Sequence, residues 1–315
     1  MEAGNTVSFS DPDGYAAGFG DASLKLTITG AGAFRAQLSC LKLQQMEVYR
    51  CYENLPRIAY VLLSAERISL SFPIGTVPHI FDGFALRPGD IVLHRPGDRM
   101  HQRLPGDCGW GLISLSPELL ATCGKALTGR HGVSLPEDRI LRPSRAEALK
   151  FRRLLGQACH LAETRQESLD RPEAASGLTQ QILHVVVQCL ASNEADDNPK
   201  TRRHHAAVMA RFEDALSKRG DERITMPTLC EEIDVPERTL RMCCAEFLGV
   251  SPTRYLLLQR LNKARSALRR ADPTMSSVAE VARDHQFLEL GRFAVTYRTT
   301  FGESPSVTLH RNPQT

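Results

Sequence analysis

The chain has 315 residues, of which 42% are hydrophobic and 24% charged, and its formal net charge is +3. This length predicts about two domains, and the composition excludes a wholly disordered chain. From residue 202 onward there are 18 Lys and Arg against 14 Asp and Glu, so the positive excess lies in the C-terminal part. The most apolar stretch, Ile182 to Ala191, is far shorter than the roughly 20 residues that span a bilayer. We therefore expect a cytoplasmic protein with no membrane partner.

Residues 1–22 are rich in Gly, Asp and Ser and lack the basic and apolar runs of a secretory signal. We expect a flexible N-terminus here. The nine cysteines are scattered, without a Cys-x-x-Cys pair, which favours reduced thiols that serve as small core residues.

Residues 23–142 contain short apolar runs separated by turn residues: LKLTI, AYVLLSA, RISLSF, HIFDGFAL, DIVLH and GWGLISLS. Two near-copies of one turn, Arg87–Asp90 and Arg95–Asp98, have proline second and glycine third, which suits a type II turn because its third position needs a positive φ. The pattern predicts an antiparallel β barrel or sandwich.

Residues 143–191 change to a helical period and predict two amphipathic helices separated at Arg171-Pro172. Their apolar stripes could pair with the same helices of a second subunit, which would make them a dimerisation segment, or could pack on their own β domain. The polar stretch 192–206, which contains Pro199, is the predicted linker.

Two segments in residues 207–311 share one plan, a short helix, a tight turn and a second helix. In the first, Thr228–Leu240, Pro236 suits the first turn of the second helix. Arg238 and Arg241 then lie on its outward face, where side chains of a recognition helix reach base edges or phosphates.

The second segment begins at Ser276 or Ser277, which can cap its first helix, and its second helix over about 289–300 carries Arg292 and Arg298. A long helix over Pro252–Arg270 joins the two segments. At 1.5 Å per residue it spans nearly 30 Å, close to the 34 Å repeat of DNA, so two recognition helices could enter successive major grooves.

These motifs resemble the AraC-type transcription regulators over about residues 207–309. The matching pieces are Arg238-Thr239-Leu240, Gly249-Val250-Ser251-Pro252 with Tyr255, Arg260-Leu261 with Ala264-Arg265, Val281-Ala282, Phe287, Gly291-Arg292-Phe293 and Phe301-Gly302-Glu303-Ser304-Pro305. The resemblance implies two helix-turn-helix units in an all-α domain. It also implies a set of DNA-contacting residues, which we call the predicted DNA set: Arg238, Thr239, Arg241, Met242, Leu290, Gly291, Arg292, Val295 and Arg298.

The chain departs from the family pattern at the turns. Gln286 and Asp234 stand where the family usually has glycine, and a non-glycine residue in left-handed geometry costs roughly 1 kcal/mol. Met242 stands where a basic residue is frequent, and Cys244 where a Phe is. We expect a loosened second unit and DNA binding that depends on dimerisation.

The N-terminal half resembles the family's usual partner, a cupin-like β barrel that senses a small molecule. His79, His94 and His101 make a poor metal set, so we expect core or surface histidines, no metal and no cofactor. The predicted function is effector-modulated transcription regulation, without enzymatic activity, by a homodimer that binds double-stranded DNA and RNA polymerase. The alternatives are a barrel that binds a protein partner and a cupin-type enzyme fused to a DNA-binding module.

Overall fold

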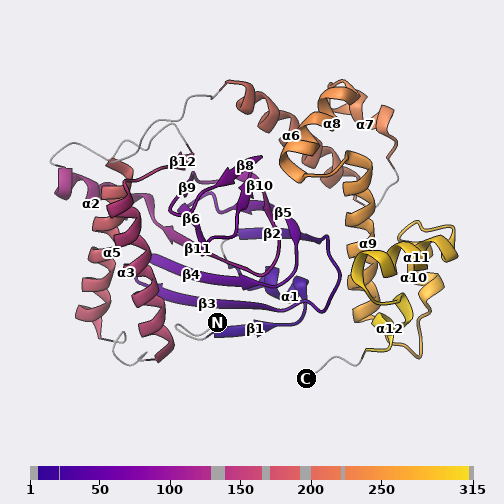
Figure 1. Cartoon of the computed structure of the whole chain (residues 1–315), viewed down its shortest axis with the longest axis horizontal. Helices are drawn as coiled ribbons and strands as arrows, with labels where there is room; N and C mark the ends of the chain where they lie inside the picture. Colours follow the sequence, from indigo (N-terminus) through magenta and orange to yellow (C-terminus); the bar gives the residue numbers. More distant parts are fainter. Residues whose placement is uncertain are drawn as a thin grey trace.

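The computed structural model describes residues 6–20, 22–128, 139–164, 171–191, 200–220 and 224–311. Figure 1 shows β strands in the centre, one group of helices on the left and the C-terminal helices on the right. No helix in these ranges is long and apolar enough to cross a membrane.

The strands form two antiparallel sheets. The seven-stranded sheet has the order β1 (Thr6–Phe9), β3 (Ala36–Leu43), β4 (Met46–Glu53), β11 (Cys108–Leu115), β6 (Ile68–Ile74), β9 (Ile91–His94) and β12 (Ile140–Leu141). The five-stranded sheet has the order β2 (Ala22–Ile28), β5 (Arg57–Leu63), β10 (Arg99–Leu104), β7 (His79–Phe81) and β8 (Phe84–Leu86). No strand pairing among the described residues joins the two sheets, so the predicted barrel is not closed and the sandwich alternative is correct.

The two predicted Pro-Gly turns are present on either side of β9. Gly89 has a φ of 101° and Gly97 a φ of 76°. The amides of Asp90 and Asp98 donate to the carbonyls of Arg87 and Arg95, at 3.0 and 3.1 Å. Because glycine adopts the left-handed conformation without a side-chain clash, these tight turns carry the chain from β8 in one sheet to β9 in the other, and back again to β10.

The prediction of a flexible stretch over residues 1–22 is wrong for residues 6–20. Strand β1 pairs with β3, and α1 (Pro12–Ala17) follows it. The ring of Tyr15 is fully buried and contacts Phe9, Phe19 and Phe34. These aromatic side chains anchor the segment in the apolar core, although the residues between them are polar or small.

Helices α2 (Pro117–Thr128), α3 (Arg145–Thr164) and α5 (Pro172–Ala191) pack against the seven-stranded sheet. Leu155, Ala158, Ile182 and Val186 share one buried cluster with strand residues of that sheet. The apolar faces of the two helices in the predicted dimerisation segment therefore pack on their own β domain, which was the alternative prediction for this segment. Leu149 and Leu161 remain 47% and 36% exposed.

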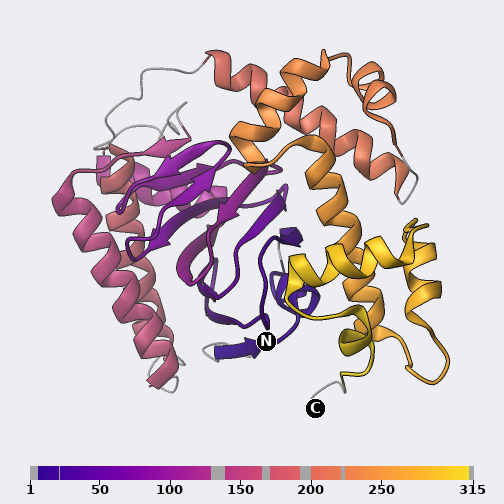
Figure 2. The same ribbon diagram turned by 45° about the vertical axis from the view of Figure 1, so that its right-hand side comes forward.

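The C-terminal part is all α. It consists of α6 (Lys200–Arg219), α7 (Met226–Glu232), α8 (Glu237–Leu248), α9 (Pro252–Arg270), α10 (Val278–Asp284), α11 (Leu290–Phe301) and α12 (Pro305–Leu309). Residues 192–199 of the predicted linker lie outside the described residues, and 200–206 are helical instead. Figure 2 shows these helices bending around one side of the strands. All nine cysteines are free, and all but Cys230 are buried.

Candidate nucleic-acid interface

The first helix-turn-helix unit is formed by α7 and α8. Thr225 caps α7, and Leu229, Ile233 and Leu240 are buried together between the helices. Asp234 has a φ of 50° in the turn, which a short polar side chain tolerates better than most. The unit matches the plan predicted from the sequence.

The second unit is formed by α10 and α11. Ser277 and Glu280 make a reciprocal capping box at the start of α10. Phe287 and Phe293 stack in the core with their ring centres 4.7 Å apart. Gln286 has a φ of 63°, so this turn is built on a left-handed glutamine, as expected from the family comparison.

The outward face of α8 carries most of the first half of the predicted DNA set. Arg238, Arg241 and Met242 are exposed, and Met242 is 52% exposed. Arg241 donates through Nε to Oε1 of Glu237 at 2.9 Å, so this guanidinium is held along the helix. Thr239 is half-buried. The face therefore offers one arginine held by a neighbouring carboxylate and another, Arg238, next to it.

The outward face of α11 carries the second half of the set. Gly291, Arg292 and Arg298 are exposed, and Val295 is 68% exposed. Leu290 instead packs against the apolar core of its unit. Its predicted contact with bases therefore competes with a structural role.

Gly291 is not explained by packing within the described structure. A Cβ built on this helical glycine would have no neighbour within 4 Å. Gly291 is the second residue of α11, and replacing a glycine by alanine where alanine fits stabilises a protein by about 0.4–1 kcal/mol. A residue with this cost and no internal reason on the outward face of α11 is typical of a surface that another molecule approaches closely.

Leu288 was not in the predicted set, although it is 75% exposed just before the N-cap of α11. The helical period gave no signal for it, because Leu288 lies in the turn before α11 and its exposure depends on the packing of Phe287. Its exposure places a large apolar side chain at the entrance of the second recognition helix.

Helix α9 connects the units and is held at both ends. Ser251 caps its N-terminus, and its 19 residues span about 28 Å. At the far end, Arg265 donates to Glu303 at 2.7 Å, where both side chains are largely buried. Burial by itself would raise the pKa of Glu303, but the hydrogen bond and charge of Arg265 lower it. The ion pair fixes the second unit to α9.

Both units also rest on the β domain. Ile58 of β5 belongs to the apolar core of the first unit, and Ile28 and Phe34 belong to that of the second. The amide of Gly32 donates to the carbonyl of Phe301, the last residue of α11, at 3.0 Å. The relative placement of the two recognition helices is therefore coupled to the β domain.

A buried polar junction lies at the first of these contacts. Oε1 of Glu213 on α6 is 2.9 Å from Nε2 of His101 on β10, and it accepts a hydrogen bond of 2.9 Å from the hydroxyl of Tyr255 on α9. Burial, together with the charge of Glu213, raises the pKa of Tyr255 well above its usual value, so the hydroxyl remains a donor. His101 thus belongs to a domain contact and, with His79 and His94, is buried.

Asn262 of α9 makes a second polar contact between the domains. Its side-chain oxygen accepts from the amide of Ile28 at 2.9 Å, and its nitrogen donates to the carbonyl of Ile28 at 3.0 Å. Because β2 is the outer strand of its sheet, this amide pairs with backbone groups that have no neighbouring strand.

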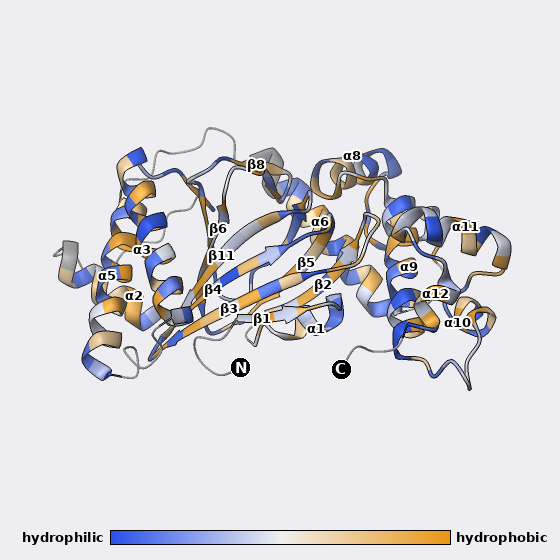
Figure 3. Cartoon of the chain, turned by 60° about the horizontal axis from the view of Figure 1, so that its bottom comes forward, coloured by the Kyte–Doolittle hydropathy of each residue, from blue (hydrophilic) through white to orange (hydrophobic). Residues whose placement is uncertain are grey.

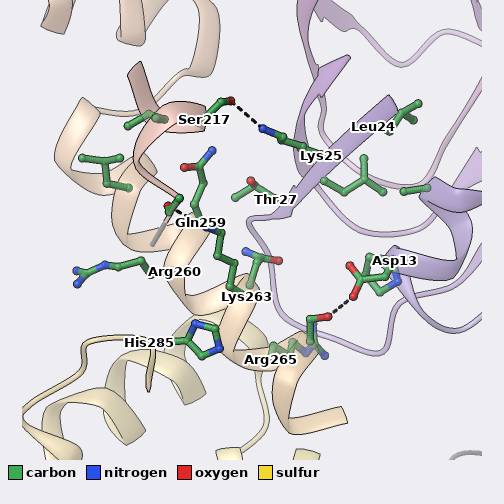
Figure 4. Close-up of a pocket in the computed structure, with 18 of the residues that line it drawn as sticks. Asp13, Leu24, Lys25, Thr27, Ser217, Gln259, Arg260, Lys263, Arg265 and His285 are labelled. Atoms are coloured by element: carbon green, nitrogen blue, oxygen red, sulfur yellow. Dashed lines mark hydrogen bonds between the residues drawn. The ribbon is translucent and has the colours of Figure 1, made fainter. Parts of the chain in front are cut away.

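Between these contacts lies a cleft of about 840 Å³, which we call the interdomain cleft. Its walls come from β2, α1, α6 and α9, and include Leu24, Leu26, Leu216 and Leu256. Figure 4 shows Lys25 on β2 and Lys263 on α9 coming from opposite sides. Lys25 donates to the hydroxyl of Ser217 at 3.0 Å. The cleft combines apolar walls with charged side chains of both signs, among them Lys25, Lys263, Asp13 and Glu213.

The C-terminal part of the chain is similar in sequence to a known family. Residues 229–311 match the family model described as a helix-turn-helix domain. The probable thc operon regulatory protein of Rhodococcus erythropolis is 32% identical over 49% of this chain and 48% of its own length, so the match spans about half of that relative. The XylDLEGF operon transcriptional activator 1 of Pseudomonas putida is 27% identical over 71% of this chain and 68% of its own length. The crystal structure of the AraC-like transcriptional activator CuxR is similar with a TM-score of 0.43 and 16% identity, covering 82% of this chain and 95% of that one.

Proposed function

We infer that this chain, which belongs to the AraC-type regulators through its C-terminal double helix-turn-helix domain, controls transcription by binding DNA sequence-specifically. The observation that carries this function is the pair of recognition helices with exposed Arg238 and Arg292, joined by one continuous helix. The length of α9 is close to the spacing of successive major grooves on one face of DNA.

The first test is an unbiased selection of DNA sequences with the full chain. We expect an enriched motif with two elements about one helical turn apart, one for each unit. Affinity for that motif should fall steeply as salt rises, because arginine and lysine displace counterions from phosphates. No enrichment, with or without metabolite pools, would contradict the proposed function.

Two arginine variants then assign the base contacts. Arg238→Ala and Arg292→Ala should each cost about 1–3 kcal/mol on the selected site and relax base preference at one position. Arg153→Ala, which removes an exposed arginine from α3, is the matched control and should leave the affinity unchanged. An equal loss on all sequences would make Arg238 and Arg292 phosphate contacts.

We further propose that a small molecule modulates this binding from the interdomain cleft. Its apolar walls and the ammonium group of Lys25 suit a ligand with an apolar body and a carboxylate. Such a ligand would contact both domains and so change how the β domain holds the recognition helices. A set of carboxylates should shift the thermal unfolding of the full chain, and Lys25→Ala should abolish the shift; a shift that survives this change would place the ligand elsewhere.

The remaining elements of the proposal concern assembly. We propose a cytoplasmic homodimer that recruits or blocks RNA polymerase, with α3 contributing Leu149 and Leu161 to the subunit contact. Sedimentation of the full chain should show a dimer, and Leu149→Glu should weaken it. A monomer at all concentrations, with undiminished DNA affinity, would contradict the dimer.

A further inference from the structure

The outward surface of the second recognition helix contains unusually large apolar exposure for a surface expected to face DNA. Val295 is 68% exposed, and Leu288 is 75% exposed just before the helix begins. The outward surface of the first recognition helix carries Arg238 and Arg241 instead, with Met242. Both units thus present two exposed arginines, Arg238 and Arg241 or Arg292 and Arg298, and the second unit adds the larger apolar exposure.

Val295 lies on the same face as the exposed residues Gly291 and Arg292, one helical turn along α11. The opposite face packs Phe293 and Tyr297 into the core. A rotation of α11 that buried Val295 would expose these two aromatic side chains, so Val295 stays on the surface. Figure 3 shows α11 at the end of the molecule far from α2, α3 and α5. No described part of the chain thus covers this apolar face.

The major groove offers one apolar group that matches such a surface. The C5 methyl of thymine projects into the major groove and makes contacts with apolar side chains, whereas guanine offers two acceptors that suit arginine. Side chains three and four residues apart on a helix are about 5–6 Å apart, comparable with one or two base-pair steps. When Arg292 contacts a guanine, Val295 would therefore reach the major-groove edge of a neighbouring base pair.

We propose that the second unit reads thymine methyl groups through Val295 and Leu288, beside a guanine contacted by Arg292. This inference rests on the proposed function and specifies the base chemistry of one half of the site. It makes the DNA element of the second unit thymine-containing, and assigns to Leu288 a specificity role outside the predicted DNA set. Gly291 contributes by leaving this face free of a side chain.

The test replaces individual thymines by uracil in the sequence selected with the full chain. Uracil keeps every hydrogen-bonding group of thymine and lacks only the C5 methyl. We expect one or two positions in the second unit's element at which uracil weakens binding roughly threefold to tenfold, as loss of one or two buried methyl contacts implies. Thymines elsewhere in the site should tolerate the change.

Exposed variants link the effect to the named side chains. In Val295→Ala, the affinities for the thymine and the uracil site should differ by no more than about twofold at the affected position. The thymine methyl group has then lost its apolar partner on the protein. Val307→Ala is the matched control, because Val307 is 52% exposed on α12, outside this face, and should preserve the discrimination. Leu288→Ala should remove a second uracil-sensitive position or weaken the same one.

The outcomes separate this inference from the function on which it rests. An enriched motif that the wild-type chain binds equally well with thymine and uracil would refute the inference and leave sequence-specific binding intact. The same holds if Val295→Ala and Leu288→Ala both keep the full uracil effect, or if the second element contains no thymine. Failure to enrich any motif would overturn the proposed function itself.

Discussion

Replacing Gly291 by alanine should change stability and DNA affinity in opposite directions. In the free protein, the added methyl meets no atom within 4 Å, so it introduces no clash. Alanine restricts the unfolded chain and favours the helix, which should stabilise α11 by about 0.5–1 kcal/mol. The thermal unfolding of the full chain should move to a higher temperature.

On DNA, the same methyl group should be unfavourable. Gly291 lies next to Arg292 on the outward face, and a recognition helix approaches base edges and phosphates to van der Waals distance. A methyl group that forces the helix outward lengthens the arginine contact, and loss of one such contact costs about 1–3 kcal/mol. We expect the affinity for the selected site, measured by fluorescence anisotropy, to fall by roughly tenfold to a hundredfold.

Gly177→Ala provides the matched control, since Gly177 is an exposed helical glycine of α5 that also has no neighbour within 4 Å of a built Cβ. It should raise stability by a similar amount and leave DNA affinity unchanged. If Gly291→Ala binds DNA as tightly as the wild type, the space above Gly291 is not used, and the reasoning from its unexplained cost fails.

Three further predictions concern stability. Gln286→Gly should stabilise the second unit by about 1 kcal/mol in thermal unfolding, because it relieves a φ of 63°; no gain would mean that the side chain offsets the strain. Glu53→Gln should cost about 3–5 kcal/mol in urea unfolding, since it leaves the fully buried Arg57 without its carboxylate; a smaller loss would mean that water reaches the pair. Burial lowers the pKa of His79 to about 4 and of His94 to about 3, so both stay neutral in the folded state while the unfolded chain takes up protons below pH 6.5. The free energy of unfolding should therefore reach its full value above pH 6.5 and be lower by roughly 2 kcal/mol per histidine at pH 5. A urea midpoint that does not change between pH 7.5 and 5 would contradict this.

The helical half was predictable because its signals are local. Proline at the start of α9, the serine and glutamate of the α10 cap and the apolar spacing of each unit all act within one or two turns of helix. Even the left-handed Gln286 and Asp234 followed from their places in the turns. The backbone of the DNA-binding surface was therefore accessible from sequence.

The contacts between the halves were not predictable in the same way. Glu213 meets His101 across 112 positions of the chain, and Asn262 pairs with Ile28 across 234. Such partners are chosen by tertiary packing, and no periodicity marks them. The interdomain cleft escaped prediction for the same reason, as did the anchoring of residues 6–20, whose aromatic side chains find their partners only in the folded β domain.

The pairing of Asn262 with β2 has a consequence for how the protein can be divided. β2 ends one sheet, and in a fragment that stops before α6 the amide and carbonyl of Ile28 would face water beside the side chains of Leu24 and Leu26. An uncovered strand of this kind is a template for the same strand of another molecule. The helical half thus shields the β half from aggregation, and the N-terminal fragment should be markedly less soluble than the intact chain.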